Sequence, residues 1–181
     1  QALRLADFRT SNDGMEVLVV TTEEVYNEFS SGAQDLVAIR DCARMFYKRN
    51  DNKFQNLLLF GDASYDYRNL SNNAQPTSLV PVYESDESMD PIYSYSSDDY
   101  VGLLDDDEGI WDGYDLLDIG IGRIPVNSTQ EAEAVVSKLI RYSSDVANLG
   151  EWRQKATYIA DSGDEDVFLQ NADKLAGVVS N

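Results

Sequence analysis

The stretch NLLLFGD, residues 56–62, contains four consecutive apolar residues followed by a glycine and an acid. An apolar run without alternating polar residues predicts a strand buried on both faces, as in the parallel sheets of α/β proteins. Ligand sites of such sheets lie beyond the carboxyl ends of the strands. Asp62 is therefore a candidate functional residue, and the alternative is that its carboxylate only caps a turn.

Comparable apolar runs, and segments with the apolar periodicity of helices, lie on both sides of this stretch. The runs are 17–20 (VLVV), 119–124 (IGIGRI) and 156–160 (ATYIA), and the helical segments are 1–9, 31–47, 128–146 and the residues after 162. Strands that alternate with helices predict a parallel sheet covered by helices on both faces. We therefore expect an open, doubly wound α/β fold.

The charge of the chain is strongly unbalanced. Its 181 residues include 33 acids and 14 bases, which gives a net charge of −19. This excess argues against nucleic acids and against anionic membrane surfaces as partners, because both require basic patches. It favours cations, either metal ions or basic peptides.

The acids concentrate in an insert, residues 69–122, that contains no Lys or Arg. Between Glu84 and Asp118 there are 13 acids, interleaved with tyrosines. Calcium takes six to eight oxygen ligands, so this insert is a candidate calcium site, and a solvated loop is the alternative. The run 105–109 (DDDEG) supplies oxygens but does not have the EF-hand spacing.

The chain has no histidine and one cysteine, Cys42. Cys42 falls within a helical segment next to its apolar stripe, which is typical of a buried small hydrophobic residue rather than of a nucleophile. We therefore assign no catalytic residue, and histidine-dependent catalysis by these 181 residues alone is excluded.

Four acids follow the apolar run 156–160, namely Asp161, Asp164, Glu165 and Asp166. Acids at the start of a helix commonly interact with the helix dipole, which is the simpler interpretation. The functional interpretation is a pocket for a basic side chain of a substrate.

Six sequence blocks occur in an order that carries a family resemblance. They are 5–8 (LADF), 24–32 (EVYNEFSSG), 38–40 (AIR), 57–66 (LLLFGDASYD), 97–100 (SDDY) and 122–125 (GRIP). Together they resemble the gingipain-type cysteine peptidases, peptidase family C25, over essentially the whole chain. Within that family they are most similar to the sortases of the bacterial type IX secretion system.

This resemblance implies a caspase-like α/β fold with two subdomains. Residues 1–150, with the insert 69–122, would form the first subdomain, and 151–181 would begin the second, catalytic one. The sheet would be incomplete at both ends. The family's catalytic Cys and His, the latter in a Gly-His-Gly setting, would fall beyond Asn181, and Cys42 does not correspond to the family nucleophile.

The resemblance also implies sites and partners. Calcium ligands of the family match Asp62, Asp118 and Asp112, and a pocket acid of its arginine-specific members matches Asp166, with Asp164 nearby. The parent would be a peptidase or sortase acting on secreted proteins that bear a C-terminal sorting domain. It would be secreted, or located at the bacterial cell surface or outer membrane.

Two other functions are alternatives from the residues alone. One is a non-catalytic calcium-binding or interaction module. The other is a phosphoacceptor domain of receiver type with Asp62 at the strand end. The second requires acids directly after the first strand, where this chain has Thr21-Thr22.

Overall fold

A computed structural model of the chain describes residues 1–49, 53–72, 78–85, 90, 92–109, 114–146 and 149–179. The chain forms two compact units, Gln1–Ile140 and Arg141–Asn181. The expected subdomain boundary at residue 150 stays a prediction, because this division reflects compactness alone. Within the described residues, none of the helices has both the length and the apolar character that crossing a membrane requires.

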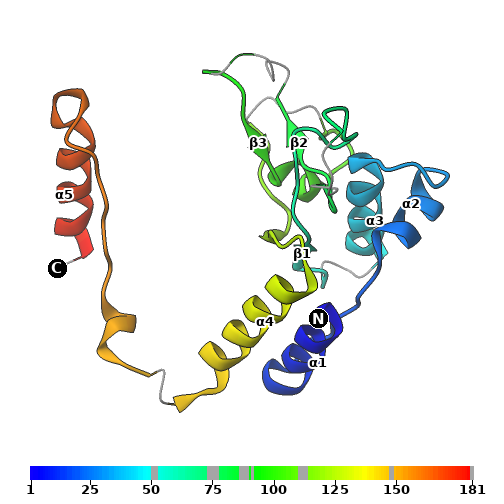
Figure 1. The fold of residues 1–181 in the computed structure, drawn as a ribbon, viewed down its shortest axis with the longest axis horizontal. Coiled ribbons are helices and arrows are strands. Elements are labelled where there is room, and N and C mark those ends of the chain that lie inside the picture. Colours follow the sequence, from blue (N-terminus) through cyan, green and yellow to red (C-terminus); the bar gives the residue numbers. More distant parts are fainter. Residues whose placement is uncertain are drawn as a thin grey trace. The chain divides into compact units, whose positions relative to one another are not determined.

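The first unit is built on two parallel strands, β1 (Asn56–Phe60) and β4 (Gly120–Ile124) (Figure 1). Asn56 is opposite Gly120 and Phe60 is opposite Ile124. The ladder continues past the strand ends, where the Gly61 amide donates to the Ile124 carbonyl at 3.0 Å. Both strands were predicted from their apolar runs, and their parallel pairing confirms the α/β fold class.

Helices cover both faces of this pair. Leu59 packs in a cluster with Val25 of α2 (Thr22–Phe29) and Ile39 of α3 (Leu36–Arg49). The next residue, Phe60, packs against a second cluster contributed by α1 (Ala2–Asp13) and α4 (Thr129–Ser144). Because successive side chains of a strand point to opposite faces, this double cover explains why Leu59 and Phe60 are both apolar, whereas Leu58 is 47% exposed.

Helix α2 was not predicted, although the sequence carries a signal for it. The Glu24 amide donates to Thr21 Oγ1 at 3.2 Å, and the Thr21 amide donates to Glu24 Oε2 at 2.7 Å. This reciprocal pair is a capping box, which satisfies backbone donors that the first helical turn leaves open. The predicted helices correspond to α1, α3, α4 and, in the second unit, α5 (Val167–Val179).

The acidic insert contains short elements of its own. β2 (Tyr83–Glu84) pairs antiparallel with β3 (Ser96–Ser97), and a 3-10 helix follows at Asp99–Gly102. Val101, in this 3-10 helix, is 1% exposed and packs in the same cluster as α2 and α3. Part of the insert is therefore ordered against the core and is not a solvated loop.

The predictions of strands at 17–20 and 156–160 are wrong for this structure, since neither segment belongs to a strand. Leu18 is 66% exposed and Ile159 is 94% exposed. A strand needs a neighbour for its backbone hydrogen bonds and an apolar layer over each face. Among the described residues neither segment has such a neighbour, so its apolar composition alone does not produce a strand.

Candidate functional site

Asp62 lies at the carboxyl end of β1, as the apolar run predicts. Its amide donates to the Val126 carbonyl at 3.0 Å, and its own carbonyl accepts from the Leu79 and Val80 amides at 2.9 and 3.2 Å. Its carboxylate Oδ1 accepts from the Ala63 amide at 3.0 Å. Three hydrogen bonds thus fix the backbone of Asp62, and its side chain caps the turn that follows the strand.

Asp118 lies at the opposite end of the same sheet. It precedes β4, whereas Asp62 follows β1, and the two strands run parallel in register. Five paired residues at a rise of about 3.3 Å each separate the two ends by roughly 13 Å or more. The structure therefore does not bring these two predicted ligands together, and one ion cannot bind both. Asp112, the third predicted ligand, lies outside the described residues.

Asp118 instead belongs to an acidic cluster with Asp105 and Glu108, whose carboxylate oxygens lie within 4.8 Å of one another. Asp118 Oδ2 accepts from the Leu104 amide at 2.7 Å, and Oδ1 accepts from the Tyr47 hydroxyl at 3.2 Å. Glu108 Oε2 accepts from the Asp105 amide at 3.0 Å. Sequence reasoning noticed the run 105–109 but did not connect it with Asp118.

The carboxylates of the acidic cluster repel one another. Burial raises the pKa of Glu108, the Asp105 amide that it accepts from lowers it, and the charges of Asp118, Asp115 and Asp105 raise it further. Burial also raises the pKa of the Tyr47 hydroxyl, to which the charge of Asp118 adds. A positive charge placed among these groups would relieve the repulsion.

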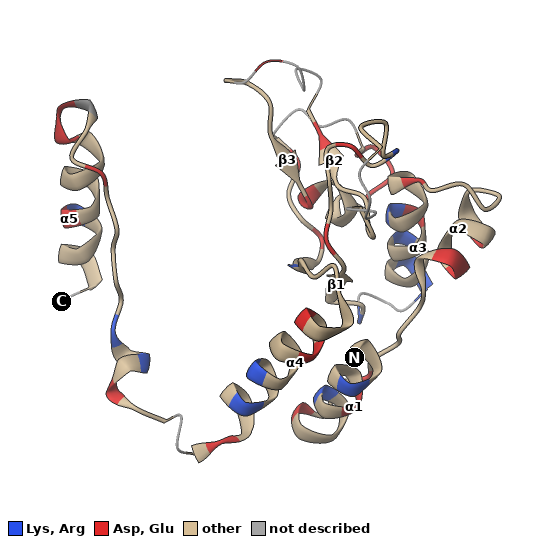
Figure 2. Ribbon diagram, in the orientation of Figure 1, with Lys and Arg blue, Asp and Glu red and all other residues tan. Residues whose placement is uncertain are grey.

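Basic residues of α3 hold the loop that carries this cluster. Arg40 Nε donates to the Leu103 carbonyl at 2.6 Å, and its Nη2 donates to the Glu108 carbonyl at 3.0 Å. Arg44 Nε donates to the Leu104 carbonyl at 3.1 Å. Figure 2 shows Lys and Arg as blue bands along α3. The insert has no base of its own, and α3 supplies positive charges to this loop of it.

A second polar arrangement lies at the carboxyl end of the sheet, where Arg123 and Asp98 form a bidentate ion pair. Arg123 Nε donates to Asp98 Oδ2 at 2.8 Å, and its Nη2 donates to Oδ1 at 2.7 Å. The remaining donors reach the carbonyls of Gly61, Val80 and Pro81 at 2.8, 2.9 and 3.1 Å. The pair joins the SDDY and GRIP blocks, a connection that the sequence analysis missed.

Cys42 is buried in α3, and this burial raises the pKa of its thiol. A nucleophilic cysteine needs a lowered pKa and access to solvent, because the thiolate is the reactive form. The surroundings of Cys42 are therefore those of a core residue.

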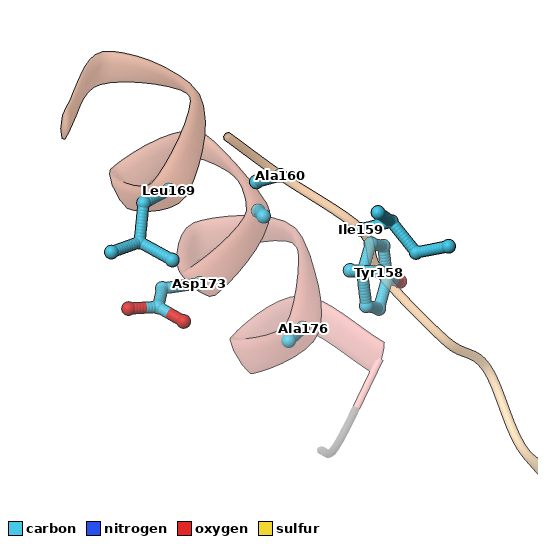
Figure 3. Close-up of a pocket in the computed structure, with 7 residues that line it drawn as sticks. Tyr158, Ile159, Ala160, Leu169, Asp173 and Ala176 are labelled. Atoms are coloured by element: carbon cyan, nitrogen blue, oxygen red, sulfur yellow. The ribbon is translucent and has the colours of Figure 1, made fainter. Parts of the chain in front are cut away.

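In the second unit, Asp164–Asp166 forms a 3-10 turn just before α5, and of Asp164 only the backbone is described. Asp166 is exposed, and its amide donates to the Gly163 carbonyl at 3.1 Å. An open cavity of about 490 Å³ lies between the segment 158–160 and α5, and its acid is Asp173 (Figure 3). Asp166 is not among the described residues that line this cavity, and the role of Asp164 and Asp166 in substrate binding stays a prediction.

Comparisons with known proteins identify the family. The sequence model of peptidase family C25 matches residues 1–181. The crystal structure of dimeric latent PorU from Porphyromonas gingivalis is similar, with a TM-score of 0.67 and 33% sequence identity over 93% of this chain. The chain spans 17% of the PorU chain. A search of curated proteins gave no match.

These matches agree with the parallel sheet and its helical cover, and they confirm the resemblance to gingipain-type proteins. The chain therefore belongs to peptidase family C25.

Proposed function

We propose that this chain is the amino-terminal part of a gingipain-like cysteine peptidase or sortase that processes secreted proteins bearing a C-terminal sorting domain. The family match over residues 1–181 is the observation that carries the proposal, and the 33% identity to PorU supports it. A location at the bacterial cell surface or outer membrane, or secretion, is part of the same proposal.

In such enzymes a cysteine thiolate attacks the peptide carbonyl and a histidine moves the protons. This chain has no histidine, and its one cysteine is buried in α3. The proposal therefore assigns the catalytic pair to a part of the protein outside these 181 residues. To the proposed enzyme, these 181 residues would contribute the sheet and the acidic cluster. They would also contribute the Arg123–Asp98 pair, which fixes the loops at the carboxyl end of the sheet.

The purified chain is expected to show no peptidase activity, because a buried cysteine without a histidine cannot act as the nucleophile. Peptides with varied residues at the cleavage position would be incubated with the chain and followed by mass spectrometry. The variant Cys42→Ala should give the same background as the unchanged chain. Turnover that Cys42→Ala abolishes would contradict the assignment.

Alkylation tests the environment of Cys42 separately. Iodoacetamide at pH 8 is expected to modify the folded chain at least about tenfold more slowly than the urea-unfolded chain, because only the exposed thiolate reacts. Equal rates would mean that the thiol is accessible and reactive, against its burial in α3.

The coding sequence after codon 181 tests the proposal as a whole. A Gly-His-Gly and then a cysteine after a further apolar strand, within about one more domain length, would support it. A reading frame that stops or continues without them would leave the alternative, a non-catalytic calcium-binding module of the same family. The acidic cluster is the observation that favours this alternative.

We also propose that the acidic cluster binds a structural calcium ion. Its three carboxylates are hard oxygen donors of the kind that calcium prefers. Each carboxylate oxygen has two lone pairs, so the bonds from the Leu104 amide and the Tyr47 hydroxyl leave acceptor capacity on Asp118. Asp105, Glu108 and Asp118 would hold the ion, and Asp62 would not.

Calcium at 1 mM is expected to raise the Tm by about 3 to 6 °C over chelator, for a Kd of about 0.1 mM. Differential scanning fluorimetry measures the shift. Asp118→Asn should remove the gain, and the matched variant Asp62→Asn should keep it. A gain that Asp62→Asn removes and Asp118→Asn keeps would place the ion at the other end of the sheet.

A further inference from the structure

An open cavity of about 580 Å³ lies beside the carboxyl end of β1 and the β2–β3 ribbon. Serines from both regions line it, and its charged residues among those described are Glu84, Asp98 and Arg123. Ligands of parallel α/β sheets bind at this end of the strands. The charged side chains decide which kind of ligand the cavity can accept.

Arg123 and Asp98 neutralise each other in the wall of the cavity. A guanidinium has five N–H donors. All of those of Arg123 are used, two on the carboxylate of Asp98 and the others on backbone carbonyls. An anionic ligand would therefore find no free donor on Arg123. The pair orders the wall and leaves Glu84 as the uncompensated charge among the described residues of the lining.

Glu84 is oriented by the ribbon. It is opposite Ser96 in the antiparallel pairing, and both residues line the cavity. The preceding residue, Tyr83, stacks on Tyr100 at 5.5 Å between ring centroids. None of the described residues forms a hydrogen bond or ion pair with the Glu84 carboxylate, and its partial burial raises its pKa. A partly buried carboxylate without a partner is costly, and a bound cation would remove that cost.

We propose that this cavity binds the ammonium or guanidinium group of a Lys or Arg side chain of a peptide, with Glu84 as its counter-ion. The serine hydroxyl oxygens beside Glu84 can accept the remaining N–H bonds of such a group. A metal ion fits less well, because calcium needs six to eight oxygen ligands and the described part of the lining has one carboxylate without a partner. The net charge of −19 attracts basic peptides to the chain in general.

The lining of this cavity belongs to the first unit, whereas the predicted acids Asp164 and Asp166 belong to the second unit. If the bound peptide is a substrate of the proposed peptidase, the cavity would recognise a basic residue of that substrate, and this part rests on the proposed function. Binding itself requires no turnover.

Two fluorescein-labelled hexapeptides would be titrated against the chain by fluorescence anisotropy in about 0.15 M salt, where long-range attraction is screened. They differ in one residue, arginine or its neutral analogue citrulline. We expect the arginine peptide to bind about tenfold more tightly, as for one charge-assisted hydrogen-bonded pair. Glu84→Gln should bring the two affinities together.

Glu133→Gln is the matched control, because it removes the same charge from an exposed position of α4. It should keep the tenfold preference. Equal binding of the two peptides, or a preference that survives Glu84→Gln, would overturn the inference. A loss of preference in both variants would also overturn it, since general attraction would then explain the result. None of these outcomes bears on the location of the catalytic pair.

Discussion

Replacing Arg123 by methionine is expected to lower the free energy of unfolding by about 3 kcal/mol. Methionine keeps much of the apolar stem but removes every hydrogen-bond donor. Asp98 would remain as a partly buried charge without its partner, and the carbonyls of Gly61, Val80 and Pro81 would lose their donors. Urea unfolding followed by circular dichroism measures the change through the midpoint and slope.

The control is the exposed pair of Arg9 and Asp13 on α1, whose side chains are 35% and 30% exposed. Arg9→Met should cost less than about 0.5 kcal/mol, because water screens such a pair. In the Arg123→Met background, Asp98→Asn should recover part of the loss by removing the unpaired charge. A cost for Arg123→Met no greater than for Arg9→Met would mean that the pair is not structurally important.

The strands of the sheet could be predicted where composition and structure agree. The strands β1 and β4 pair with each other, and helices pack against both faces of the pair, although Leu58 of β1 stays 47% exposed. The run 17–20 has the same composition, yet Val17, Leu18 and Val20 are 39%, 66% and 45% exposed. An apolar run favours burial in a sheet, but it forms a strand only where a second segment pairs with it, and the run itself does not specify that segment.

Single residues of the candidate site could be predicted from the sequence, but not which of them lie close together. Asp62 was identified from its place after a strand, and Asp118 from the family resemblance. That they lie at opposite ends of the sheet follows from the register of β1 with β4, which no local pattern reveals. For the same reason the Asp98–Arg123 pair, separated by 25 residues, was missed.

Replacing Arg40 by methionine is expected to lower the free energy of unfolding by about 2 to 3 kcal/mol, from the loss of buried hydrogen bonds to a charged donor. Arg40 is 7% exposed, and its guanidinium fastens the backbone of Leu103 and Glu108 to α3. It also packs against Gly109, where an added Cβ would lie 3.0 Å from Nη1. Thermal and urea unfolding in chelator measure the cost.

Arg44→Met separates burial from charge. Both arginines project from α3 to the same acidic loop, and each substitution removes one positive charge, but the side chain of Arg44 is 29% exposed. If buried hydrogen bonds account for most of the stabilisation by Arg40, Arg44→Met should lower the free energy of unfolding by about half as much as Arg40→Met, or less. Equal costs would mean that charge balance around the acidic cluster dominates, and added salt should then reduce both.

The variant Arg40→Met also tests whether Arg40 influences calcium binding by the acidic cluster. Without Arg40, the carboxylates of Asp105, Glu108 and Asp118 lose a nearby positive charge, so their mutual repulsion increases and their attraction for a cation increases with it. If the acidic cluster binds calcium, the ion should raise the Tm of Arg40→Met by more than that of the unchanged chain, provided the loop keeps its shape. An unchanged calcium gain in Arg40→Met, together with the loss of the gain in Asp118→Asn, would mean that the guanidinium holds the loop without influencing the ion. No gain in the unchanged chain would contradict the proposal that the acidic cluster binds calcium.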